Sequence, residues 1–248
     1  MQYGICHLSI VPIRSSAEET AEMVSQLLYG EHYKVLEQRK HWSRIRTAFD
    51  KCEGWIQNLQ LTFIEETLYN ELTKDKYPHF TIDLVSYIEM DKNNLLPIVL
   101  GSVFQPKWNH IHEGALITSK QKKSNLINTA LQYLNTPYLW GGKTPFGIDA
   151  AGFTQMVYKI NGYHLLRNAT AQATQGTALS FIEESEAGDL AFFDNNEGII
   201  DHVGIIMENN YIIHVHGKVR IDRLDHTGIF NNDTKTYTHQ LRVIKKII

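Results

Sequence analysis

The stretch 138–153, YLWGGKTPFGIDAAGF, constrains the fold of this chain more than any other. Residues 138–147 hold three glycines and a proline, which favour turns over regular structure. From Ala150 onward the pattern becomes that of a helix, because apolar residues recur at i, i+3, i+4 and i+7 along one face. These residues are Phe153, Met156, Val157 and Ile160, and Asn161-Gly162 then provides a stop.

Asp149, Ala150 and Ala151 therefore lie at or just inside the N-terminus of a helix. Backbone N–H groups at that end have no helical partner, and the helix dipole places partial positive charge there. Such a position favours an anion or a thiolate. Alanine at this point has no reactive group.

Length and charge narrow the class of protein. A chain of 248 residues suits two or three domains. The formal net charge of -3 argues against non-specific nucleic-acid binding. No apolar run approaches the roughly 20 residues that span a bilayer, so we expect no membrane partner. We expect a cytoplasmic protein, or a periplasmic or secreted one if a signal peptide has been removed.

The two cysteines, Cys6 and Cys52, do not make a disulfide framework in a chain of this length. They could pair with each other, but the sequence favours buried free thiols. Neither lies in a motif that would make it a nucleophile.

The first part of the chain, residues 1–65, is predicted to be a small all-β barrel. Segments 23–28, 33–37 and 42–48 have strand character, and turn residues separate them. Residues 66–120 are predicted to hold a polar linker at 71–78 and then a second, degraded barrel with strands at 81–88 and 95–100.

The third part, residues 121–248, is predicted to be an α+β domain. A helix over 126–134, with Ser124 as its N-cap, precedes the Ala150 helix. A set of strands follows, and Asn209-Asn210 between two of them is a hairpin turn. The expected strands are 189–193, 202–207, 211–216, 219–224 and 241–247.

Three segments of this third part resemble the NlpC-type papain-like cell-wall endopeptidases, in the family's order. Residues 138–153 resemble the nucleophile segment, which in the family follows roughly Tyr-x-Trp-Gly-Gly…Gly-x-Asp-Cys-Ser-Gly-Phe. Residues 201–205, DHVGI, resemble the segment of the general base. Residues 213–217, IHVHG, resemble the segment of the third triad residue. The resemblance implies a papain-like fold for this part.

The N-terminal part resembles a bacterial SH3-like domain, on the strand Trp42-Ser-Arg-Ile-Arg and the element Gly54-Trp55-Ile56. Such domains often precede NlpC-type catalytic domains. The fold class is therefore α+β, a papain-like C-terminal domain preceded by one or two small SH3-like barrels.

The resemblance also implies the catalytic positions. His202 is the expected base, and His214 is the residue expected to orient it. Ala150 stands where the family has its nucleophilic cysteine. Ala151 stands where serine is usual and offers a backbone N–H.

Further residues are implied to contact the substrate. The Tyr138 hydroxyl and the Ala150 N–H are the expected donors to the oxyanion and the substrate carbonyl. Asp149 is expected to bind a free substrate amine or to order its loop. Asn168 follows Arg167 where the family has aspartate, so hydrogen bonding remains but the charge is lost. From the barrel, Glu53 is the candidate acid for a substrate ammonium, and Tyr33 is a weaker candidate.

Histidine pairs raise the question of a metal. His110 with His112, and His214 with His216, each place two imidazoles on one face of a strand, which zinc could use. No cysteine or carboxylate is patterned around them at ligand spacing. We expect no metal site and no cofactor.

Without a thiol there is no acyl-enzyme, so the chain is expected to be inactive or nearly so. An introduced Cys→Ala change and a natural pseudoenzyme both fit. The sequence favours the first, because Tyr138, Asp149, His202 and His214 all remain.

The expected parent function is a cysteine endopeptidase for murein peptides. The resemblance implies cleavage between γ-D-glutamate and a diamino acid, in peptides with a free N-terminal L-Ala, by a monomer that recycles wall peptides. A wall-peptide binding module without turnover is the alternative. An acyltransferase or amidase of the same fold shares the triad but lacks the usual SH3-like partner.

Overall fold

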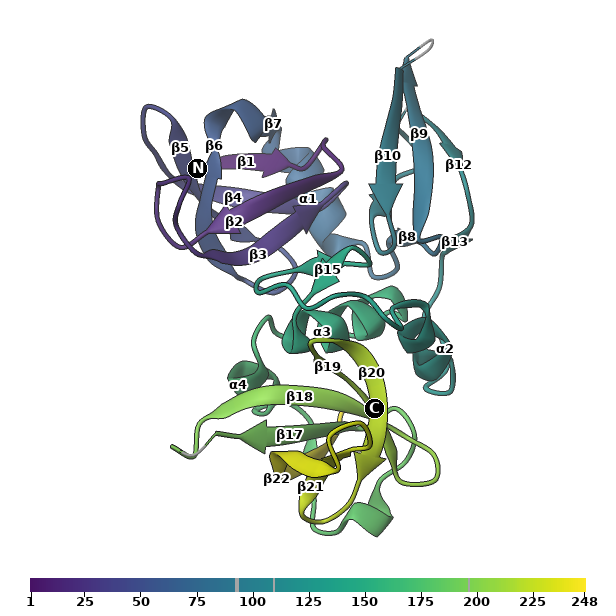
Figure 1. Cartoon of the computed structure of the whole chain (residues 1–248). Helices are drawn as coiled ribbons and strands as arrows, with labels where there is room; N and C mark the ends of the chain where they lie inside the picture. The colour runs from purple at the N-terminus through teal and green to yellow at the C-terminus, as the bar shows by residue number, and fades with distance from the viewer. Residues whose placement is uncertain (92–93, 109, 196) are drawn as a thin grey trace. The chain divides into compact units, whose positions relative to one another are not determined.

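The computed structural model describes residues 1–91, 94–108, 110–195 and 197–248. Its backbone divides into two compact units. Unit 1 holds residues 1–120 and 140–145, and unit 2 holds residues 121–139 and 146–248. Figure 1 shows the elements of both units and labels most of them as in the text below.

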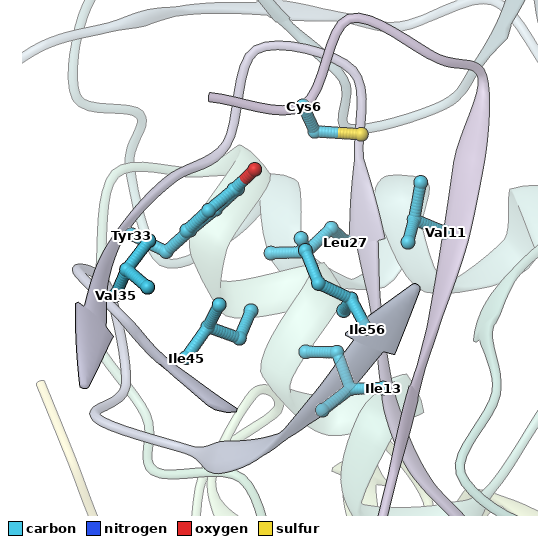
Figure 2. Close-up of a cluster of buried hydrophobic side chains, with 8 residues drawn as sticks. All are labelled: Cys6, Val11, Ile13, Leu27, Tyr33, Val35, Ile45 and Ile56. Atoms are coloured by element: carbon cyan, nitrogen blue, oxygen red, sulfur yellow. The ribbon is translucent and has the colours of Figure 1, made fainter. Parts of the chain in front are cut away.

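A seven-stranded antiparallel sheet opens unit 1, in the order β3-β2-β6-β5-β4-β1-β7. In β5 the side chains alternate between buried and exposed, which is why its period-2 pattern predicts a strand. Figure 2 shows the apolar cluster that this sheet encloses, which includes Cys6, Tyr33 and Ile45. The strands are β1 (Gln2–Ile5), β2 (Ile10–Arg14), β3 (Met23–Leu28), β4 (His32–Gln38), β5 (Trp42–Thr47), β6 (Glu53–Gln57) and β7 (Thr62–Ile64).

The rest of unit 1 contains helix α1 (Glu66–Lys74) and two three-stranded sheets, β10-β9-β12 and β11-β8-β13. A second cluster of buried residues, Tyr29, Ile88, Ile98 and Phe104, forms their core. The strands are β8 (His79–Thr81), β9 (Val85–Asp91), β10 (Asn94–Val99), β11 (Val103–Phe104), β12 (Ile111–Glu113) and β13 (Leu116–Ile117), and a 3-10 turn spans Asn58–Gln60.

Two expectations for this region were wrong in detail. The predicted linker 71–78 begins inside α1, because Tyr69 and Leu72 are buried and hold that helix in place. The predicted strand 81–88 is split into β8 and β9. Between them the chain bends at residues 83–84, where Asp83 accepts a hydrogen bond from the Ala115 N–H at 2.6 Å.

Unit 2 combines helices with a closed sheet. Strand β22 pairs with both β17 and β21, so β17 to β22 close into a six-stranded barrel, and β16 extends the sheet beside β22. The strands are β16 (Thr177–Leu179), β17 (Leu190–Asp194), β18 (Ile200–Met207), β19 (Tyr211–His216), β20 (Lys218–Leu224), β21 (Gly228–Asn231) and β22 (Thr236–Lys246).

Helix α3 (Ala150–Ile160) is the most enclosed helix of unit 2, since every one of its residues is buried. It contacts α2 (Asn125–Gln132), β18 and β19. The short helix α4 (Ala169–Gln172) also contacts β18. Strand β14 (Lys143–Thr144) lies in unit 1, β15 (Gly147–Ile148) lies in unit 2, and a 3-10 turn spans Ile182–Glu184.

Some of the local sequence predictions for unit 2 agree with the structure and others do not. Asn209 and Asn210 both have positive φ, 59° and 60°, which confirms the predicted hairpin turn. Ser124 was expected to cap α2, but its backbone is already helical and its side chain makes no cap hydrogen bond within the described residues. Strand β21 was not predicted.

Candidate active site

The N-terminus of α3 is held by Asp149. Its backbone is extended, and its Oδ1 accepts a hydrogen bond from the Gly152 N–H at 2.6 Å. Arg167 donates two hydrogen bonds to the same carboxylate, from Nη1 to Oδ1 at 3.0 Å and from Nη2 to Oδ2 at 2.6 Å. Bidentate pairs of this kind fix geometry as well as charge. Asp149 therefore orders the start of the helix, and its contact with a substrate amine stays a prediction.

Ala150 and Ala151 are the first two residues of α3, and both are buried. Their backbone N–H groups belong to the first turn, where helix geometry supplies no i−4 partner. At residue 150, where the sequence analysis expects the nucleophile, the side chain is a methyl group. The helix end thus keeps its field and its donors without a side chain that can attack a carbonyl.

His202, His214 and Asp222 form a hydrogen-bonded series in unit 2. His202 Nε2 lies 2.9 Å from His214 Nδ1, and His214 Nε2 lies 3.0 Å from Asp222 Oδ2. An ionised carboxylate only accepts hydrogen bonds, so His214 donates through Nε2 and accepts through Nδ1. His202 must then donate through Nε2. Its Nδ1 keeps the lone pair that a general base needs.

Arg220 completes the far end of the series. Its Nε lies 2.6 Å from Asp222 Oδ2 and its Nη2 lies 2.9 Å from Oδ1. Burial opposes ionisation of Asp222, but hydrogen bonds from His214 and Arg220 outweigh it and hold the pKa of Asp222 well below its usual value. The carboxylate therefore stays charged and fixes the His214 tautomer.

Burial favours the neutral form of both imidazoles. It lowers the pKa of His202 well below the ordinary value, with neighbouring histidines adding to the effect. Burial also lowers the pKa of His214, although the Asp222 carboxylate acts in the opposite direction. A neutral His202 is the form that can accept a proton.

His239, on β22, lies against the same pair. Its ring stacks on His202 with centroids 3.9 Å apart and planes 22° apart. Burial lowers the pKa of His239 to about 3, and the nearby His214 and His216 add to this. The sequence analysis missed both His239 and Asp222. The sequence held one clue to Asp222, which is an acid on the same face of a predicted strand as the apolar Leu224. No local pattern distinguished His239.

Gly204 makes room for this arrangement. It lies opposite His214 in the β18–β19 register. A Cβ at residue 204 would lie 2.7 Å from Ile212 Cδ1 and 2.9 Å from His214 Cβ. The glycine of the DHVGI segment is therefore required by the close approach of the neighbouring side chains.

Comparisons with known proteins find relatives for both the N-terminal and the C-terminal part of the chain. A model of the NlpC/P60 family matches residues 135–238, and a model of the bacterial dipeptidyl-peptidase Sh3 domain matches residues 13–61. The γ-D-glutamyl-L-lysine dipeptidyl-peptidase of Bacillus subtilis strain 168 is 38% identical over 212 residues, covering 77% of this chain and 71% of that protein. The chain belongs to the NlpC/P60 family.

Other members extend the likeness along the chain. Dipeptidyl-peptidase 6 of Lysinibacillus sphaericus is 24% identical over 241 residues, covering 83% of this chain and 85% of that protein. The crystal structure of an NlpC/P60 family protein from Bacillus cereus ATCC 10987 covers 99% of both chains, with a TM-score of 0.81 at 18% identity. This shows the NlpC/P60 papain-like fold with an SH3-like domain.

The remaining substrate-binding candidates lie in different surroundings. Tyr138 is 45% exposed, and its pKa is raised by partial burial and by the charge of Asp149, so its phenol lies in the field of that carboxylate. Asn168 caps α4, with its Oδ1 accepting from the Ala171 N–H at 2.8 Å. Both assignments in this NlpC/P60 domain stay predictions.

The two candidates from the SH3-like domain differ in accessibility. Glu53 on β6 is partly exposed, and hydrogen bonds from Arg46 and Arg44 lower its pKa. A substrate ammonium would have to compete with both guanidinium groups. Tyr33 is fully buried in the core shown in Figure 2, so it is not available to a substrate.

The histidine pair 110 and 112 does not converge on one point. His110 Nδ1 lies 2.8 Å from the Tyr29 hydroxyl, whereas His112 Nε2 lies 3.0 Å from Ser86 Oγ. The two rings thus serve separate structural contacts. In the described part of the chain, no helix is long and apolar enough to cross a membrane.

Proposed function

We propose that this chain binds murein peptides that contain a γ-D-glutamyl bond to a diamino acid, and that it does not cleave them by the thiol route of its family. The main support for this proposal is the alanine at the start of α3. The same domain retains the hydrogen-bonded series, with 2.9 Å between the His202 and His214 ring nitrogens and 3.0 Å between His214 and the Asp222 carboxylate. The site keeps its base, its orienting residues and its backbone donors, and only the attacking atom is missing.

The substrate class follows from the relatives. The Bacillus subtilis relative is named a γ-D-glutamyl-L-lysine dipeptidyl-peptidase, a name that specifies a γ-D-glutamyl-L-lysine bond and release of a dipeptide. Release of a dipeptide implies recognition of a free N-terminus, which supports L-Ala-γ-D-Glu as the leaving portion. Lysine or diaminopimelate is the proposed third residue.

The absence of turnover has a chemical reason. A cysteine peptidase divides amide hydrolysis into acylation, which forms a thioester and releases the amine, and deacylation, in which water cleaves that thioester. A methyl group forms no such bond, and losing a nucleophile costs up to about 10⁶-fold in kcat. His202 alone cannot replace it, because general-base catalysis contributes only about 10²–10⁴-fold.

Retention of the series favours a peptidase as the parent of this chain. A buried carboxylate and a buried histidine cost stability unless they are fully paired, and Arg220 supplies that pairing here. We propose that such an arrangement reflects a working parent site with cysteine at 150. Sequencing the gene at codon 150 distinguishes an introduced alanine from a natural one. If the alanine is natural, the protein is a wall-peptide binding module.

Calorimetric titration of the chain with L-Ala-γ-D-Glu-diaminopimelate and with its lysine analogue tests the proposal. The same mixtures are followed overnight by mass spectrometry. We expect saturable one-to-one binding and intact tripeptide. The N-acetylated tripeptide is the control for the free amine and should bind more weakly. Release of L-Ala-γ-D-Glu, or failure to bind either tripeptide, would overturn the proposal.

A further inference from the structure

We propose that His202, His214 and His239 form a binding site for a divalent transition-metal ion, with Zn²⁺ as the preferred ion. One ring nitrogen from each lies within 4.8 Å of the others. The proposal does not depend on the wall-peptide function, because it concerns the imidazole cluster alone.

The barrel frame presents the three rings together. His202 is on β18, His214 on the adjacent β19, and His239 on β22, which pairs with both β17 and β21. His202 and His214 are buried, and His239 is partly buried. Ligands on separate strands of a closed sheet are held more precisely than ligands on loops.

A hydrogen bond behind the cluster orients His214 as in metal sites, and His239 has a polar neighbour of its own. His214 donates its Nε2–H to Asp222 at 3.0 Å, and Arg220 holds that carboxylate in turn. His239 Nδ1 lies 2.9 Å from Thr238 Oγ1. Metal-bound histidines almost always donate their second N–H to a carboxylate, a carbonyl or water. His214 would offer its Nδ1 to an ion, and His239 would offer its Nε2 when its Nδ1 donates to Thr238.

Binding replaces one hydrogen bond and turns one ring. The proton now shared between His202 Nε2 and His214 Nδ1, 2.9 Å apart, would give way to the metal. His202 would then carry its proton on Nδ1, a change of tautomer without net proton release. The rings of His202 and His239 are stacked, and each nitrogen lone pair lies in the plane of its own ring. Because these two planes are nearly parallel, one of the two rings must rotate before both can bind the same ion.

Three imidazole ligands suit zinc and leave one position open. Zinc–nitrogen bonds of about 2.0–2.1 Å in a tetrahedral site place ligand nitrogens roughly 3.3 Å apart, within the range that the cluster spans. The fourth position would hold water or a peptide oxygen. The sequence analysis expected no metal because it weighed only His110 with His112 and His214 with His216. The third ligand comes from the last strand, far along the chain.

Two measurements test the site. The first is calorimetric titration of EDTA-treated protein with ZnCl₂, and the second is the visible absorption spectrum of the same protein loaded with Co²⁺. We expect one ion per chain with micromolar or tighter affinity, and a cobalt spectrum of a tetrahedral nitrogen site without a thiolate charge-transfer band. Asp222→Asn should weaken zinc binding by about 10–100-fold.

Two variants of His239 locate the ion. His239→Gln should weaken zinc binding at least about 100-fold. His239→Phe should do the same while keeping an aromatic ring against His202, so it serves if the first variant unfolds. His226→Gln, a change at an exposed turn, is the matched control and should bind zinc like the parent. Undiminished binding by both His239 variants, a thiolate band, or no stoichiometric binding would overturn the proposal.

Discussion

His214 donates a hydrogen bond to Asp222 at 3.0 Å, and the same Asp222 oxygen accepts from Arg220 Nε at 2.6 Å. This contact fixes which nitrogen of His214 carries the proton, and through it the nitrogen of His202 that is free to act as a base. We therefore propose that Asp222 is a positioning residue for the expected base, His202.

Asp222→Asn should impair catalysis once a thiol is present. In the Ala150→Cys background, we expect kcat/KM to fall by about 10²–10⁴-fold, because the amide no longer enforces the productive tautomer. Steady-state cleavage across pH 5–9 is the measurement. A merely structural role would lower stability but leave the shape of the pH profile unchanged, and that outcome would contradict the assignment.

Gly204→Ala should destabilise unit 2. The new Cβ would lie 2.7 Å from Ile212 Cδ1 and 2.9 Å from His214 Cβ, so the side chains must shift. We expect a loss of about 1–3 kcal/mol in the free energy of unfolding, measured in urea. Gly217→Ala is the control, because its Cβ meets open space and only its φ of 71° opposes alanine. Equal losses in both variants would refute the steric argument.

Glu31→Gln should be among the most damaging changes in unit 1. Lys143 is buried, and its Nζ lies 3.1 Å from Glu31 Oε1. Removing the carboxylate leaves a buried ammonium with its main counter-charge gone, at a cost of about 3–5 kcal/mol. Denaturant titration is the measurement, and a loss under 1 kcal/mol would contradict the expectation.

Glu53→Gln provides the matched comparison within the same unit. Its partners Arg44 and Arg46 are well exposed, with side-chain exposures of 46% and 45%. Exposed pairs contribute about 0–1 kcal/mol each. This variant should therefore unfold close to the parent, and the difference between the two glutamates measures the effect of burial.

Cys6 should resist alkylation in the native protein. Burial raises the pKa of its thiol to about 12, so only about 1 in 10⁴ molecules carries a thiolate at pH 8. Iodoacetamide labelling with peptide mapping should find Cys52, which is partly exposed, modified first, and both thiols modified after unfolding. Rapid native labelling of Cys6 would show that the barrel core is open to reagent.

Local sequence patterns accounted for the elements whose signal is local. The strand at 23–28, the turn at Asn209-Asn210 and the helix that begins at Ala150 all agree with the structure. Period, turn chemistry and helix stops are short-range properties. The family motifs singled out His202 and His214, which lie 2.9 Å apart in the structure, and their catalytic roles stay predictions.

The rest depends on pairing between distant segments. Strand β21 is only four residues long, and it exists because β20 and β22 both pair with it. His239 joins the histidine pair only when β22 closes the barrel, so no spacing along the chain could place it there. Ser124 has the residue type of a cap, but its helical backbone removes it from that role.

Cleavage by Ala150→Cys beside the parent chain tests the central claim most directly. Both are incubated with L-Ala-γ-D-Glu-diaminopimelate and L-Ala-γ-D-Glu-L-Lys, and products are identified by mass spectrometry. The double variant Ala150→Cys with His202→Gln is the control for the base. We predict release of L-Ala-γ-D-Glu by Ala150→Cys, at least about 10³-fold faster than by the parent or the double variant. Cleavage by the parent at a similar rate, or no cleavage by a folded Ala150→Cys, would contradict the account.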